Sequence, residues 1–198
     1  MNFYESTIKQ LSQAIFMKTF FKTIFSTFII LLVMGCGKAV AQTNILVVID
    51  QDYAKKNEVL SQIPSGVAVL QLKSTSNPWK DIREKLTSDN DLKQIHLFAE
   101  SGFNSLLMGG TEYNADKVQS EFELSMLEGI YTGTHYQLLL YTCNLPSNPE
   151  GLDLIKELGN RTYFNIAAST NCIEGSDHDL NFDYTTLDQP IAGSIFKN

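Results

Sequence analysis

The feature that most constrains the fold is an unbroken apolar run, Asn44-Ile-Leu-Val-Val-Ile-Asp50. Every residue between its polar ends is aliphatic, and four of the five are β-branched. A strand without polar alternation is typical of a parallel sheet that is buried on both faces. Further strand-like runs follow at 67–72, 94–99, 137–141 and 163–168.

Segments with helical spacing lie between these runs, at 52–63, from Asn77 onward, at 114–127 and at 150–158. We interpret Asp50 as a turn residue and Asp52 as the cap of the first helix, which Pro64-Ser65-Gly66 ends. In the second helix Trp79, Ile82 and Leu86 are expected to face inward, and in the third Val118, Phe122, Met126 and Leu127.

Between the third strand and the third helix, the segment 105–113 predicts a hairpin that turns at Gly109-Gly110. The alternating segment 180–184 predicts a sixth, edge strand after the five main strands. Alternating strands and helices predict a single α/β domain, a three-layer sandwich around a mostly parallel sheet of five or six strands.

The amino-terminal 41 residues are predicted to be a signal segment, which leaves residues 42–198 as the folded domain. A basic stretch at 17–22 precedes an almost wholly apolar stretch at 23–34, the pattern of a secretory signal. Met17 is a second candidate start of translation. Residues 1–16 would then be an upstream misreading; alternatively, their apolar spacing permits a short extra helix. The apolar stretch is short for a membrane span of about 20 residues.

Two cleavage sites compete in this segment. Val33-Met34-Gly35-Cys36 resembles a bacterial lipobox with Cys36 as the lipidated residue, whereas Ala39-Val40-Ala41 fits an ordinary signal peptidase. We therefore expect an exported protein that is periplasmic, an outer-membrane lipoprotein or secreted. Contact with the membrane is expected only through a lipid anchor or the signal segment.

The remaining domain is strongly acidic. Four of the 15 basic and one of the 22 acidic residues precede residue 42, which leaves 11 basic and 21 acidic residues, a formal net charge of −10. Such a surface disfavours nucleic acid and anionic lipid as partners. We expect an unidentified protein or peptide partner at the cell envelope and no cofactor. We also expect no metal site, because the two cysteines of the domain are too few for structural zinc.

Candidate functional residues follow the ends of the predicted strands. In open parallel sheets the ligand crevice lies beyond the carboxyl ends of the strands. Those ends carry the candidate binding residues Asp50, Ser101, Asn144, Ser169 and Thr170. They also carry Glu100, Cys143 and Cys172, which determine whether the site could act as a cysteine nucleophile or forms a disulfide.

These strand ends resemble a bacterial family known as domain of unknown function 4347. The resemblance covers about residues 45–184 and rests on six pieces: 48–50, 63–67, 95–97, 113–116, 139–143 and 167–170. The family in turn resembles the caspase, gingipain and separase-like peptidases, whose histidine follows the third strand and whose cysteine follows the fourth. The resemblance therefore implies a caspase-like fold and aligns Cys143 with the cysteine.

At the other catalytic position the chain departs from that pattern. Glu100 aligns with the histidine, Ser101 with the glycine after it, and Thr142 stands where the family commonly has glycine. A neighbouring carboxylate raises the pKa of a thiol, whereas an imidazolium lowers it. As a base, Glu100 would have to take the proton of the Cys143 thiol. The ordinary pKa values of a carboxyl and a thiol differ by about 4 units, so this transfer costs roughly 6 kcal/mol.

Three histidines are candidates to replace the missing base. We expect His96 to be a buried, hydrogen-bonded core residue and His135 a surface loop residue, whereas the loop of His178 opens on the edge that carries Cys143. The candidate, degenerate catalytic set is thus Cys143, Glu100 and His178. Two further hypotheses for Cys143 are a buried, unreactive thiol and a disulfide with Cys172.

The sequence favours a catalytically inactive, exported domain that acts as a binding or surface-interaction module. The alternative is an exported cysteine endopeptidase that uses Cys143 with His178. A third hypothesis is a structural subunit of a surface assembly. The acidic group of residues 177, 179 and 183 could bind calcium weakly, but we interpret it as a solvated turn because it lacks a regular loop spacing.

Overall fold

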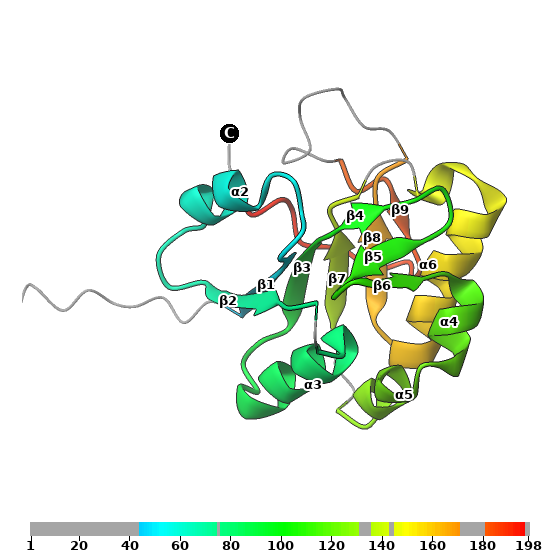
Figure 1. The fold of residues 1–198 in the computed structure, drawn as a ribbon, viewed down its shortest axis with the longest axis horizontal. Coiled ribbons are helices and arrows are strands. Elements are labelled where there is room, and N and C mark those ends of the chain that lie inside the picture. Colours follow the sequence, from blue (N-terminus) through cyan, green and yellow to red (C-terminus); the bar gives the residue numbers. More distant parts are fainter. Residues whose placement is uncertain (1–43, 75, 131–135, 143–144, 171–180, 197–198) are drawn as a thin grey trace, which may run out of the picture. The chain divides into compact units, whose positions relative to one another are not determined.

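A six-stranded sheet organises the folded part of the chain (Figure 1). The structure, a computed structural model, describes residues 44–74, 76–130, 136–142, 145–170 and 181–196. The strands are β1 (Ile45–Asp50), β2 (Ala68–Leu72), β3 (Gln94–Phe98), β7 (Gln137–Leu140), β8 (Asn165–Ala168) and β9 (Tyr184–Thr185). Their order is β2-β1-β3-β7-β8-β9; the first five are parallel and β9 runs antiparallel to β8.

The two faces of this sheet are covered differently. Helices α3 (Pro78–Ser88), α4 (Ala115–Ser120), α5 (Phe122–Glu128) and α6 (Pro149–Thr162) supply apolar side chains to one face. The other face is covered by α2 (Lys56–Gln62) and by the extended segment 191–196. In Figure 1, α2 and α3 lie on opposite sides of β1 and β2. The predicted three-layer α/β sandwich with a mostly parallel sheet is confirmed.

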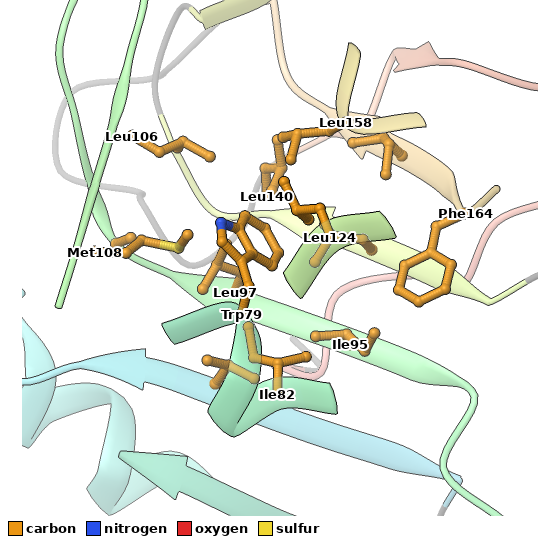
Figure 2. Packing of buried hydrophobic residues seen from close by; sticks show 14 of the residues in the cluster. Trp79, Ile82, Ile95, Leu97, Leu106, Met108, Leu124, Leu140, Leu158 and Phe164 are labelled. Carbon is orange, nitrogen blue, oxygen red and sulfur yellow. The ribbon is translucent and has the colours of Figure 1, made fainter. Parts of the chain in front are cut away.

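The larger core lies beneath the helices of the first face. Trp79 of α3 lies among Leu97, Met108 and Leu140, all buried (Figure 2). The ring of Tyr113 meets that of Trp79 edge to face, with 6.0 Å between centroids. This helix begins at an Asn-Pro pair, where the Asn77 carboxamide oxygen accepts the backbone N–H groups of Trp79 and Lys80.

A second, three-stranded antiparallel sheet adds side chains to the same core. It consists of β4 (Glu100–Ser101), β5 (Leu106–Met108) and β6 (Thr111–Tyr113). The predicted hairpin is confirmed, with Gly109 and Gly110 at φ values of 57° and 71°. Positive φ at both central residues matches the tight turn that joins twisted antiparallel strands.

Three predicted helix boundaries are wrong. The first helix begins at Lys56, not at Asp52, so Asp52 does not cap it. The helix predicted at 114–127 is broken at Glu121, whose backbone is extended. The last helix continues through Gly159 to Thr162 and ends at Tyr163, so β8 begins two residues later than predicted.

Glu121 explains the broken helix. Its carboxylate is buried and accepts hydrogen bonds from the Asn77 side chain at 3.1 Å and from the Glu123 backbone N–H at 3.3 Å. The break changes which side of α5 faces the core. Leu124 and Leu127 are buried, whereas Phe122 and Met126, predicted to face inward, are 68% and 45% exposed.

Candidate functional site

The carboxyl ends of β1, β3, β7 and β8 lie at one edge of the sheet because these strands are parallel; we name it the carboxyl edge. Strands β3 and β7 are neighbours, with Leu97 paired to Leu140. One residue further, the Tyr141 N–H donates to the Leu97 carbonyl at 2.9 Å, and the rings of Phe98 and Tyr141 stack at 4.1 Å. The predicted adjacency of the third and fourth main strands is confirmed up to this point.

Asp50 ends β1 as a buried structural carboxylate. Its Oδ1 accepts the backbone N–H of Asp52 at 2.8 Å, and its Oδ2 accepts that of Gly109 at 2.6 Å. Only 1% of the residue is exposed. The predicted turn role is confirmed, and the second bond also fastens the tip of the β5–β6 hairpin to the sheet. Both oxygens have donors, so the described contacts account for this side chain without a ligand.

Glu100 begins β4, beyond the end of β3. It is exposed, and its Oε1 accepts the backbone N–H of Ala54 at 2.9 Å. This bond joins the chain after β3 to the loop between β1 and α2. Ser101 beside it pairs with Leu106 in the small sheet and is partly exposed. The binding role of Ser101 stays a prediction.

Thr170, after β8, belongs to a group of hydrogen bonds at the other end of this edge. Its backbone N–H donates to the Asp183 carboxylate at 2.7 Å, and its hydroxyl donates to the other oxygen of that carboxylate. These two bonds hold the pKa of Asp183 below its usual value. The Thr170 carbonyl in turn accepts the Ser147 hydroxyl at 2.6 Å. The adjoining Ser169 is buried.

Asn148 is a contributor that the sequence reasoning missed. Its carboxamide oxygen accepts the Gly151 N–H at 2.7 Å and so caps α6, while its nitrogen donates to the Phe103 carbonyl at 2.7 Å. The signal was present in the sequence, because Asn148-Pro149 repeats the Asn77-Pro78 pattern at the start of α3. The side chain of Phe103 is 70% exposed at this rim.

His96 lies within β3, as predicted for a core residue. It is fully buried, and its Nδ1 lies 2.9 Å from the Tyr141 hydroxyl. Burial lowers the pKa of His96 to about 4, so the ring is neutral at pH 7. Within the described residues its Nε2 has no hydrogen-bond partner. A neutral, enclosed imidazole does not supply the positive charge that stabilises a thiolate.

Several predicted residues lie outside the described part of the chain. These are Cys36, His135, Cys143, Asn144, Cys172 and His178. Their predicted roles, including the lipidation of Cys36 and the disulfide between Cys143 and Cys172, stay predictions. Among residues that the structure does describe, no three histidine, cysteine, aspartate or glutamate side chains gather in a group able to hold a metal ion. No helix in the same ranges has the length and apolarity needed to cross a membrane.

The described part of the carboxyl edge is therefore a frame built from carboxylates that accept backbone N–H groups. Asp50, Glu100 and Asp183 each hold a neighbouring segment in this way. Carboxylates used as acceptors stabilise loops and offer no proton to a reacting group. Within the described ranges the arrangement restrains the backbone beside an exposed aromatic side chain, Phe103.

The fold and this edge define a three-layer α/β domain with a mostly parallel sheet whose loops gather at one rim. The chain belongs to the family described as Domain of unknown function (DUF4347), whose model matches residues 46–194. The family resemblance drawn from the strand ends is thereby confirmed. Comparison with curated proteins gave no match. Comparison with solved structures gave none either.

Proposed function

We propose that this chain is an exported, non-catalytic domain of caspase-like fold that acts at the cell envelope as a binding or surface-interaction module. Its partner would be a protein or peptide rather than nucleic acid, because residues 42–198 carry a net charge of −10. The caspase-like assignment is supported by the strand order, in which β3 and β7 are parallel neighbours that end at one edge.

The contact of Glu100 with Ala54 is the observation that carries the proposal. In the caspase-like pattern this position belongs to the histidine that activates the thiol. Here a carboxylate stands in its place and accepts a backbone N–H at 2.9 Å from the loop after β1. A carboxylate near Cys143 would raise the pKa of that thiol and lower its nucleophilicity at neutral pH.

The surface proposed for partner binding is the carboxyl edge around Phe103. This side chain is 70% exposed, and its own carbonyl is held by Asn148. An aromatic side chain on a restrained backbone can enter a partner's pocket with little loss of conformational entropy. At the same edge, the Thr170–Asp183 contact joins the end of β8 to the segment before β9.

Export is proposed from residues 17–41 alone, with Cys36 as the lipidated residue or Ala41 as the last residue removed. Mass spectrometry of the mature amino terminus distinguishes these two products. A lipid-modified Cys36 indicates an anchored protein, and an amino-terminal Gln42 indicates a free one.

The inactive character is tested with a thiol-reactive peptide probe on the purified protein. We expect slow labelling of Cys143, at a rate close to that of Cys172, and no cleavage of peptide substrates. Rapid stoichiometric labelling that disappears in Cys143→Ala would contradict the proposal. Peptide cleavage abolished by both Cys143→Ala and His178→Ala would establish the endopeptidase alternative.

A further inference from the structure

A pocket of about 540 Å³ lies beside the sheet, away from the carboxyl edge. The second half of α6 forms one wall, and the chain from Tyr184 to Leu187 forms the other. Its lining is mainly apolar with a few polar groups, and its volume is in the range of small-molecule sites. In Figure 1 these walls are the yellow-to-orange helix α6 and the red strand β9.

Tyr163 lines this pocket in an unusual backbone conformation. It is the residue that ends α6, with φ of 57°, and within the described residues it alone has positive φ without being glycine. Glycine or asparagine is the usual residue at such a position because a side chain there is strained. The ring of Tyr163 is nevertheless 48% exposed and forms part of the pocket wall.

Gly159, in the lining of the same pocket, is a second residue that is unfavourable for its local structure. Glycine weakens the interior of a helix relative to alanine, and Gly159 lies within α6. A Cβ at this position would meet the Thr186 side chain at 3.4 Å, an ordinary contact, so packing does not require glycine. At Gly151 of the same helix a Cβ would lie 1.9 Å from the Leu145 carbonyl oxygen, so there it does. The missing side chain of Gly159 keeps the pocket open.

Two locally unfavourable residues that meet at one pocket indicate selection for a purpose other than stability. Strained backbone and poor helix formers are expected where function overrides local preference. Replacing either residue by a better helix former or a better cap would be expected to stabilise the fold. Their placement therefore points to a ligand.

The chemistry of the lining limits what that ligand is. The rings of Tyr163 and Tyr184 offer apolar surface, and the Asn160 side chain has no hydrogen-bond partner among the described residues. Lys156 is the one charged residue in the described lining. A neighbouring hollow of about 280 Å³ shares Lys156 and Asn160 but adds Asp116, Asp153 and Glu157. An ammonium beside three carboxylates disfavours a ligand of strong single charge.

We propose that this pocket and the adjoining hollow bind a short, neutral oligosaccharide. One sugar ring would rest its C–H face on Tyr163 and Tyr184, because aromatic rings bind apolar surface over a large, rigid area. The next sugar would direct hydroxyl groups to the Asn160 carboxamide and to Asp153. The pocket is separate from the carboxyl edge, so this assignment stands whether or not Cys143 is reactive.

Calorimetric titration of the purified full chain with cellotetraose, chitotetraose and maltotetraose tests the proposal, with tetragalacturonate as a charged comparator. We expect saturable binding of at least one neutral tetrasaccharide, tighter than that of tetragalacturonate. Tyr163→Asn and Gly159→Leu should each weaken that binding at least about tenfold. Both variants should unfold at the same or a higher temperature, because Tyr163→Asn eases the positive-φ backbone and Gly159→Leu replaces a poor helix former.

Phe122→Asn is the matched control, since it removes an aromatic side chain that is 68% exposed on α5, outside the pocket. It should leave the affinity unchanged. Absence of saturable binding by all three neutral tetrasaccharides overturns the proposal. So do tighter binding of tetragalacturonate, unchanged affinity in Tyr163→Asn and Gly159→Leu, or an equal loss in Phe122→Asn.

Discussion

At the scale of single residues, burial decides what His96 can do. The ring is enclosed between the sheet and the carboxyl-terminal segment, and its neighbour Tyr141 also accepts the Ile195 N–H at 3.2 Å. Desolvation disfavours the charged imidazolium and lowers its pKa from 6.5 to about 4. His96 therefore contributes to stability and to the pH dependence of folding rather than to acid–base chemistry at the edge.

This lowered pKa predicts a loss of stability in mild acid. The unfolded chain protonates His96 near pH 6.5, and the folded chain does so near pH 4, so the unfolded state binds more protons between these values. Stability from this group is complete above pH 6.5 and is lost as the pH falls toward 4, by about 3 kcal/mol. Urea denaturation of wild type and His96→Gln at pH 7, 5.5 and 4 measures the effect.

The comparison with the variant separates His96 from the other groups that titrate in this range. The wild type should lose up to about 3 kcal/mol more than His96→Gln between pH 7 and pH 4. Parallel losses in the two proteins would show that His96 does not resist protonation in the folded state. His96→Gln keeps a polar side chain near Tyr141, so the two proteins differ mainly in whether residue 96 can take up a proton.

At the scale of the elements, close backbone approach fixes the start of α6. Gly151 lies in its first turn, and a Cβ there would lie 1.9 Å from the carbonyl oxygen of Leu145. That oxygen belongs to the 3-10 helix η1 (Leu145–Ser147), which joins β7 to α6. A backbone atom cannot rotate away as a side chain does, so the glycine is what allows η1 and α6 to pack.

Gly151→Ala should therefore destabilise the fold by about 3 kcal/mol, the upper end of what overpacked buried sites typically cost. Gly193→Ala is the control, because a Cβ at Gly193 meets no atom within 4 Å. Thermal and urea unfolding of both variants measure the difference. Equal stabilities of the two variants would mean that η1 shifts freely.

The sequence predicted the elements better than their ends. The buried runs, the hairpin turn at Gly109-Gly110 and the helix start at Asn77-Pro78 were predicted correctly because each is a local signal. The break at Glu121 was missed because it depends on a hydrogen bond to Asn77, 44 residues earlier. The extension of α6 past Gly159 was missed because glycine was interpreted as a stop.

The candidate site was predictable only in part, for a similar reason. Parallel strands bring Asp50, Glu100 and Thr170 to one edge, and this follows from topology alone. Which donors those side chains bind depends on loops from other parts of the chain, such as Ala54 for Glu100 and Gly109 for Asp50. Such pairings have no sequence pattern.

At the scale of the whole domain, the described residues cover the second face of the sheet with less helix than the first. Among the described residues, α2, the segment 191–196, Tyr53 and Phe182 cover it, and hydrogen bonds to Gln137 hold the segment 191–196. The Gln137 side chain donates to the Pro190 carbonyl at 3.0 Å and accepts the Ala192 N–H at 2.8 Å. Both faces of the sheet are thus covered by described residues, and the two proposed binding surfaces lie at its rims.

Those rims differ in character. The carboxyl edge carries loops held by carboxylates, with Phe103 exposed, whereas the side by β9 carries the pocket of about 540 Å³. The proposed binding module would use one rim for a protein or peptide partner and the other for a sugar chain. The sugar pocket does not depend on Cys143, whereas the non-catalytic character proposed for the module depends on a Cys143 thiol that no base activates.

The rate of Cys143 alkylation, measured as a function of pH, tests most directly whether a base activates this thiol. Iodoacetamide reacts with the thiolate, so its rate at each pH, measured by peptide-resolved mass spectrometry, gives the pKa of the thiol. The account predicts a half-maximal rate at or above about pH 8.5, and a shift to lower pH in Glu100→Gln, which removes the negative charge. A half-maximal rate below about pH 7 in the wild type, raised by His178→Ala, would contradict it.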